Sequence, residues 1–364
     1  MALSMNMPVI HRRKTRAVPV GPATIGGDAP VSVQGMTKTA TTDVEATVAQ
    51  VAALADAGAD LVRVAVPTRQ DTDALKQIVK RSPVPIIADV HFHFDRALEA
   101  IDAGAAKIRL NPGNIADRGQ VRRVIASAAA AGVSIRVGVN EGSVVERADQ
   151  DRRRSELARN LDELMEQKLA EYLEVFQEAG FHNLVLSAKS HDAFTCVALY
   201  RRLAARWDYP LHLGVTHAGP ADLGAIRSAA AIGTLLAEGI GDTVRISYAG
   251  DPLPEVRSAL ELLYALRLRP RKGLEIIACP TCGRAQTDIV PIIDQVRAAL
   301  AGVKAPLTVA VMGCVVNGPG EAQAADVAVC AGAGKALLYR RGELVRTVSA
   351  DQIAQAILEE VKRL

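Results

Sequence analysis

Histidine is absent after His217, and aromatic residues make up only 3% of the 364-residue chain. So few aromatic side chains cannot supply the stacking platform of a single-strand nucleic-acid binder. No uninterrupted apolar run approaches the ~18 residues of a membrane span, and the first residues lack the apolar core of a secretory signal. We therefore expect neither nucleic acid nor membrane as a partner, and a cytoplasmic location.

Cysteine and net charge are also scarce. Five cysteines fit a reducing compartment better than a disulfide framework. A net charge of +3 over the whole chain is too small to predict a polyanion partner, so functional positive charge must be local. What is abundant is apolar sequence, 49% of residues, which is enough for a well-packed core.

Eight short β-branched runs alternate with amphipathic stretches, which predicts a (β/α)8 TIM barrel in the α/β class. A doubly wound sheet is the alternative, but no GxGxxG motif supports it. The expected strands are 31–36, 61–66, 85–90, 107–111, 134–140, 183–189, 211–216 and 243–248, and expected helices include 43–57, 116–131, 156–179 and 219–238.

The chain is long enough for a barrel and a second domain. A helix over 251–268 closes the predicted barrel, and the sequence RPRKG at 269–273 is typical of a linker. We expect a substrate-binding barrel over 1–268 and a small α+β domain over 269–364.

Polar residues cluster near the C-terminal ends of the predicted strands, where a TIM barrel builds its active site. Five of these strands carry a cation, and several unpaired buried cations are tolerated only if an anion neutralises them. Arginine also suits bidentate phosphate binding. The pattern predicts a small diphosphate substrate, bound by Arg63, Asp89, His91, Arg109, Asn111, Arg136, Asn140, Lys189, Arg245 and Ser247.

The C-terminal region holds a sulfur pattern, Cys279-Pro-Thr-Cys282, followed by Cys314 in MGCVVNGPGE. Three thiolates without histidine need a fourth ligand, either the sulfur of Cys330 or an oxygen of Glu321. Soft thiolates select zinc or an iron–sulfur cluster. The residues alone leave both metals open.

These segments together resemble the bacterial 4-hydroxy-3-methylbut-2-en-1-yl diphosphate synthases, the IspG or GcpE family of the non-mevalonate isoprenoid pathway. The resemblance spans both domains. It rests on VQGMTKTATTDVEATVAQV, KIRLNPGN, IRVGVN, LHLGVT, EGIGDTVRIS, ACPTCGR and MGCVVNGPGE.

The resemblance implies an oxidoreductase with a [4Fe-4S] cluster that opens 2-C-methyl-D-erythritol 2,4-cyclodiphosphate by two-electron reduction. It implies Cys279, Cys282, Cys314 and Glu321 as metal ligands, with Glu321 displaceable during catalysis, and the strand-end residues as the substrate site. Flavodoxin or ferredoxin is the implied electron donor.

One position departs from the family pattern. Where the family reads LGxTEAG this chain reads LGVTHAG, so that His217 replaces an acid expected to donate or relay protons. A histidine can still donate a proton, but it adds positive charge to a cationic pocket. We expect His217 to be catalytic and the enzyme to be slower.

Topology predicts the assembly. The closing helix returns the chain to the barrel face opposite the strand ends, so the cluster domain begins at the wrong end of its own barrel. A homodimer in which each cluster domain faces the partner's barrel resolves this, and the resemblance implies the same.

Two alternative functions differ from the reductase. A non-redox phosphate-binding barrel transferase, similar to dihydropteroate synthase, would use a structural zinc held by Cys330. A zinc-ribbon binding module for RNA or protein leaves the strand-end cations unexplained.

Overall fold

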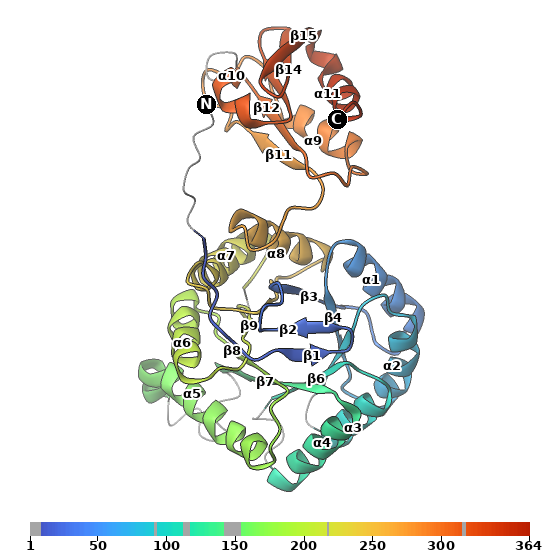
Figure 1. Ribbon diagram of the computed structural model, residues 1–364, viewed down its shortest axis with the longest axis vertical. Coiled ribbons are helices and arrows are strands. Elements are labelled where there is room, and N and C mark those ends of the chain that lie inside the picture. The colour runs from blue at the N-terminus through green and yellow to red at the C-terminus, as the bar shows by residue number, and fades with distance from the viewer. Residues whose placement is uncertain (1–8, 91–92, 112–116, 142–153, 217, 315–317) are drawn as a thin grey trace. The chain divides into compact units, whose positions relative to one another are not determined.

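The structure, a computed structural model, describes residues 9–90, 93–111, 117–141, 154–216, 218–314 and 318–364 (Figure 1). Of residues 154–160 and 321 it describes only the backbone. The chain forms two compact units, Met1–Arg269 and Pro270–Leu364. Each is considered by itself.

The first unit is the predicted TIM barrel. Its parallel sheet has the strand order β8-β7-β6-β5-β4-β3-β10-β9, and a bridge from Leu186 to Leu211 joins the two ends. The strands are β3 (Ser32–Met36), β4 (Leu61–Ala65), β5 (Ile86–Asp89), β6 (Lys107–Leu110), β7 (Ser134–Asn140), β8 (Leu184–Lys189), β9 (His212–Leu213) and β10 (Thr243–Val244).

Eight helices of the described chain surround these strands in the ring seen in Figure 1. Side-chain caps fix where several of them begin: Asp43 caps the first, and Thr68 and Asp71 form a capping box at the second. The helices are α1 (Val44–Asp56), α2 (Arg69–Arg81), α3 (Phe94–Asp102), α4 (Arg118–Ala131), α5 (Arg154–Glu178), α6 (Ala193–Arg206), α7 (Ala221–Ala237) and α8 (Leu253–Ala265).

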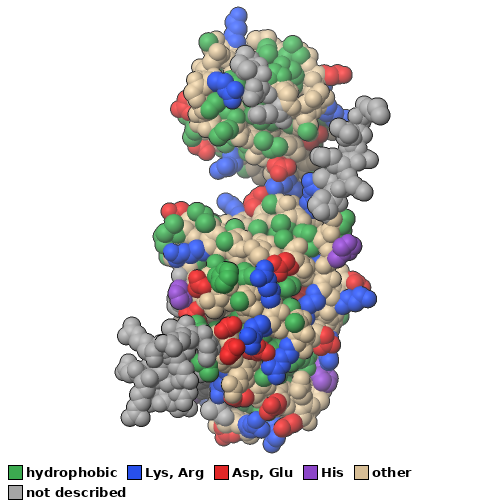
Figure 2. All heavy atoms as spheres, turned by 90° about the vertical axis from the view of Figure 1, so that its left-hand side faces the viewer, with side chains coloured by type: hydrophobic (Ala, Val, Ile, Leu, Met, Phe, Trp, Pro, Cys, Tyr) green, Lys and Arg blue, Asp and Glu red, His purple; other side chains and the backbone are tan. Residues whose placement is uncertain are grey.

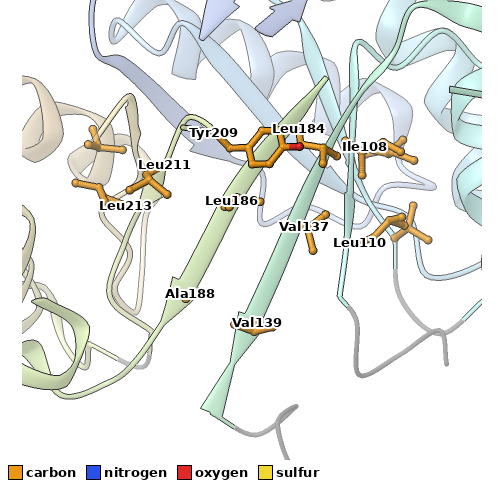
Figure 3. Close-up of a cluster of buried hydrophobic side chains, with 14 of the residues drawn as sticks. Ile108, Leu110, Val137, Val139, Leu184, Leu186, Ala188, Tyr209, Leu211 and Leu213 are labelled. Atoms are coloured by element: carbon orange, nitrogen blue, oxygen red, sulfur yellow. The ribbon is translucent and has the colours of Figure 1, made fainter. Parts of the chain in front are cut away.

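Alternate residues of each strand pack between the sheet and the helices. Figure 3 shows Ile108 and Leu110 of β6 beside Val137 and Val139 of β7, all fully buried or nearly so. Burying side chains of this size stabilises the fold by about 1.5–3 kcal/mol each. Because strand side chains alternate, the remaining strand residues face the barrel axis. They are apolar on some strands near the N-terminal end, as at Leu61, Ile87 and Val185, and mostly polar toward the C-terminal end.

A short hairpin closes the N-terminal end of the barrel. Strands β1 (Val18–Val20) and β2 (Ala23–Ile25) pair antiparallel. Their apolar side chains join Leu61, Ile87 and Val185 in a separate buried cluster. The sequence analysis did not predict this hairpin, because three-residue strands give too short an alternation to be seen.

The second unit is a five-stranded mixed sheet with the order β11-β12-β13-β14-β15 and helices packed on it. Strand β15 was not predicted, because most of its residues are polar or exposed. The elements are β11 (Glu275–Ala278), α9 (Val290–Ala299), β12 (Thr308–Met312), α10 (Gly318–Glu321), β13 (Val327–Ala331), β14 (Lys335–Arg340), β15 (Glu343–Ser349) and α11 (Ile353–Val361).

The visible surface of the barrel unit mixes basic and acidic side chains without a large field of one sign (Figure 2). Every helix in the described part of the chain is too short or too polar to serve as a membrane span.

Candidate active site

A cavity of about 590 Å³ opens at the C-terminal ends of the barrel strands. The parallel strands bring side chains distant in sequence to this one end. Its lining is Arg63, Asp89, Arg109, Arg136, Asn140, Ser187, Lys189, Val215, Thr216, Ala218, Gly219, Arg245, Ser247, Tyr248 and Ala249.

Positive charge dominates this cavity. Among the described residues that line it, five side chains are cationic and one, that of Asp89, carries a carboxylate. Arg63 Nε lies 3.7 Å from one Asp89 oxygen, and Arg109 Nη1 lies 3.4 Å from the other. Arg136 is only 1% exposed, and its Nε has no hydrogen-bond partner among the described residues. Asp89 cannot neutralise all five charges, although Glu255 of α8 pairs with one of them, Arg245.

Burial lowers the pKa of these cations. Desolvation is the largest cause for Arg109, Arg136 and Lys189, and neighbouring arginines lower their pKa further. The pKa of Arg245 falls to about 10, again chiefly through burial. A bound anion would favour the charged forms, so the cavity is built for a small ligand with more than one negative charge.

Glu255 of α8 holds two cations at the rim of this cavity. Its carboxylate is 2% exposed, accepts a 2.8 Å hydrogen bond from Lys38 Nζ and lies 3.3 Å from Arg245 Nη2. The backbone N–H of Tyr248 also donates to it, at 3.1 Å. The sequence analysis missed Glu255 because it lies on a helix and not at the end of a strand.

Replacing Glu255 with glutamine is expected to lower the free energy of unfolding by about 2–3 kcal/mol, because two partly buried cations lose their counter-charge. Urea denaturation of the purified protein measures this. Glu261→Gln, an exposed change on the same helix, should stay within about 0.5 kcal/mol of the parent. Equal stability of the two variants would contradict the role given to Glu255.

The cavity gathers eight of the ten residues predicted to bind substrate. Asn111 is buried just beyond β6 but is not among the lining residues. His91, and the predicted catalytic His217, lie outside the described residues. The lining also includes Ser187, Thr216 and Tyr248, which the sequence analysis did not select. Thr216 could have been found, since it ends the predicted strand 211–216.

In the second unit, two cysteine-bearing turns lie at the same edge of the sheet. Cys279 and Cys282 follow β11, and Cys314 follows the neighbouring parallel strand β12. The backbone N–H of Gly313 donates a 3.1 Å hydrogen bond to Cys279 Sγ. The pKa of exposed Cys282 is lowered, chiefly by a hydrogen bond from the backbone of Arg284, which favours the thiolate.

Cys279, Cys282 and Cys314 therefore follow neighbouring strands, but their side chains are not gathered into a ligand set. Among the residues that the structure describes, no three His, Cys, Asp or Glu side chains are gathered tightly enough to hold a metal ion. Glu321 ends α10, and its side chain is not described. Cys330 is fully buried within β13, and its thiol has a pKa raised to about 11, mainly by burial.

Family models match both units. The model described as the GcpE TIM-barrel domain matches residues 15–260, and that of the GcpE protein C-terminal domain matches residues 275–363. The chain belongs to the GcpE family.

Close relatives of this GcpE-family chain are curated synthases. The 4-hydroxy-3-methylbut-2-en-1-yl diphosphate synthase (flavodoxin) of Corynebacterium jeikeium is 49% identical over 354 residues, 97% of this chain and 90% of the relative. The synthase of the same name from Cutibacterium acnes is 47% identical over 371 residues, 100% of this chain and 96% of the relative.

Among solved structures, the N-acetylneuraminic acid synthetase of Leptospira borgpetersenii matches 80% of this chain and 100% of its own, with a TM-score of 0.50 and 10% identity. Such a likeness supports the barrel fold alone.

Membership of the GcpE family implies an iron–sulfur-dependent oxidoreductase of isoprenoid biosynthesis. The second unit fits such a group in residue type and location. It offers soft sulfur ligands at one sheet edge and a backbone N–H already donating to sulfur. Histidine is absent from this unit, so its soft metal ligands are cysteines.

Proposed function

We propose that this GcpE-family chain reduces 2-C-methyl-D-erythritol 2,4-cyclodiphosphate to 4-hydroxy-3-methylbut-2-enyl diphosphate and water, with two electrons and the protons that balance them. The observation that carries the proposal is the cavity that the described residues line with five cations and one carboxylate. The names of the curated relatives support the same reaction. The cavity would also suit a phosphate-binding barrel transferase with a structural zinc, but the names of the relatives do not favour that function.

The barrel residues bind and orient the substrate. Arg63, Arg109 and Arg136 offer guanidinium groups that can bond the diphosphate oxygens in pairs. Asp89 holds two of these arginines in position through the contacts at 3.7 and 3.4 Å. Asn140, Ser247 and Lys189 add hydrogen-bond donors from other strands. This set retains the diphosphate, which stays attached through one ester when the ring opens.

Cys279, Cys282, Cys314 and Glu321 would hold a [4Fe-4S] cluster in the second unit. Once bound, it supplies low-potential electrons for breaking a carbon–oxygen bond. His217, at the position where the family carries an acid, is the residue of this chain that would give a proton to the departing oxygen.

Flavodoxin is the proposed electron donor, as the names of the relatives suggest, and a homodimer is the proposed assembly. The ion pair between Arg269 and Asp60, at 2.6 Å, supports the dimer. Asp60 precedes β4, so the chain leaves the barrel at the end opposite the cavity. The proposed homodimer, in which each cluster unit serves the partner's cavity, rests on this exit point.

The proposal is tested by anaerobic purification, followed by iron and sulfide quantitation and visible absorption with and without the cyclic diphosphate. We expect about four irons per chain, a chromophore that changes with substrate, and product formation with reduced flavodoxin. A colourless protein that holds one zinc would overturn the redox assignment.

Replacing His217 with glutamate is expected to raise kcat about 10-fold or more, because it restores the acid that the family carries at this position and a well-placed acid contributes about 10²–10⁴-fold. Single-turnover assays measure the gain. His182→Glu, a change in the same unit at an exposed position away from the cavity, should give none. Unchanged turnover in His217→Glu would remove the explanation offered for this position.

A further inference from the structure

A second polar layer lies inside the barrel, below the cation-lined cavity. Strand residues two apart face the same side, so the residues that precede the inward-facing cavity residues by two also face the axis. Where the lower residue is polar, the pairs, lower residue first, are Lys107 and Arg109 on β6, Ser134 and Arg136 on β7, and Thr243 of β10 with Arg245 just beyond it.

This layer is sealed from solvent. The side chains of Lys107, Ser134, His212 and Thr243 are all 0% exposed. The apolar cluster made by the N-terminal hairpin closes the same end of the barrel. The layer can therefore exchange water or protons most directly through the cavity above it.

Polar atoms of the layer lack partners. Lys107 Nζ, Ser134 Oγ, Thr243 Oγ1 and both ring nitrogens of His212 have no hydrogen-bond partner among the described residues. An unsatisfied buried group costs about 1–3 kcal/mol, and native proteins satisfy such groups with buried water. Orphan donors and acceptors on four strands are consistent with a small group of ordered waters.

Arg136 connects this layer with the cavity. Its side chain lines the cavity, is 1% exposed, and places Nη1 3.4 Å from Gln34 Oε1. Gly214, two residues after His212, allows the Lys189 side chain of the cavity to approach this part of the barrel. A Cβ at Gly214 would lie 2.7 Å from Lys189 Nζ, so the missing side chain lets that ammonium sit beside β9. A charge bound in the cavity therefore changes the electrostatic potential at the residues of the layer below.

We propose that this layer is a hydrated chamber in which Lys107 takes up a proton when the diphosphate fills the cavity above it. The inference rests on the proposed function, because that function supplies the anion. It adds a coupled protonation site that is distinct from the residues that bind the substrate.

The direction of the effect follows from the charges. Burial, then the nearby Arg136 and Arg63, hold the pKa of Lys107 far below its ordinary value, so the neutral amine is favoured while the cavity is empty. A bound dianion offsets the field of those arginines and raises the pKa of Lys107. At a pH between the pKa of Lys107 in the empty enzyme and its higher pKa in the complex, ligand binding is accompanied by the uptake of a proton.

Other titratable groups inside the barrel compete with Lys107 for this proton, and the Lys107→Met variant distinguishes Lys107 from them. Burial and the same cations lower the pKa of His212, which shares the layer and competes for the proton. The charged and titratable side chains that face the barrel interior around Lys107 are Arg63 on β4, Asp89 on β5, Arg109 on β6, Arg136 on β7, Lys189 on β8, His212 on β9 and Arg245 after β10.

Calorimetric titration of the purified enzyme with the cyclic diphosphate, in buffers of different ionisation enthalpy, counts the protons exchanged. Each phosphorus of a cyclic diphosphate carries one strongly acidic oxygen, so the ligand itself does not titrate near pH 8. We expect about one proton taken up per ligand in the window between the two pKa values, and an affinity that falls about tenfold per pH unit there.

Lys107→Met removes the amine at similar volume and is expected to abolish the uptake while leaving the enzyme folded. Lys76→Met, an exposed change on α2, should leave the uptake intact. Binding without proton uptake by the parent enzyme would overturn this inference alone, whether or not the variant folds. Undiminished uptake in Lys107→Met would also overturn it, and no binding heat at all would overturn both it and the proposed substrate.

Discussion

Replacing Cys279 with serine is expected to lower kcat at least about 10³-fold and to remove most of the bound iron, because a serine oxygen is a hard and weakly acidic ligand where iron–sulfur chemistry needs a soft thiolate. Cys279 Sγ already accepts a hydrogen bond from Gly313 N at 3.1 Å, which fixes it at the sheet edge. Iron quantitation and turnover with reduced flavodoxin, both without oxygen, measure the two losses.

Cys330→Ala is the matched control. Cys330 is buried in β13, and the high pKa of its thiol, about 11, makes it a poor thiolate ligand. This variant should keep its iron and most of its turnover, although the small cavity left by the sulfur costs some stability. Equal loss of metal from both variants would instead support a four-cysteine zinc site. Full iron content in Cys279→Ser would contradict the ligand assignment.

The barrel could be predicted because its strands carry strong periodic signals, whereas the exact extent of two strands could not. Residues 211–216 and 243–248 were predicted as strands, but the regular ladders cover only His212–Leu213 and Thr243–Val244. The residues beyond them, including Thr216 and Ser247, line the cavity instead. The residues that form a site at the strand ends still have high β-propensity, although they no longer pair with a neighbouring strand. The sequence pattern therefore predicts strands that are too long.

The cation cluster could be predicted in outline because all its members occupy one kind of position, near the end of a strand. Lys107 and Glu255 could not be found in this way. Lys107 begins its strand and looks like a surface residue in KIRLN, and Glu255 lies in an ordinary amphipathic helix. Their burial, 0% and 2% exposed, results from closure of the barrel and from helix packing, which a linear pattern does not contain.

Replacing Arg136 with methionine is expected to lower kcat/KM about 10²- to 10³-fold while leaving the free energy of unfolding unchanged or higher. The guanidinium is 1% exposed, and its neighbours Arg63 and Arg109 repel it. Losing a buried charge-assisted contact to a phosphate costs about 2–5 kcal/mol of binding. Removing an uncompensated buried charge in favour of an apolar side chain of similar size is often stabilising. Steady-state kinetics and urea denaturation on the same preparation measure both quantities.

Arg122→Met provides the matched comparison, since Arg122 lies exposed on α4 and, among the described residues, pairs with exposed Glu178 at 2.9 Å. That variant should change kcat/KM less than about twofold and stability by less than about 1 kcal/mol. The two measurements on Arg136→Met then separate two roles. Lower stability with unchanged kcat/KM would mean that Arg136 holds the barrel together, and would contradict its assignment to the substrate. Lower kcat/KM with preserved stability means that the fold tolerates this buried charge because the bound diphosphate neutralises it.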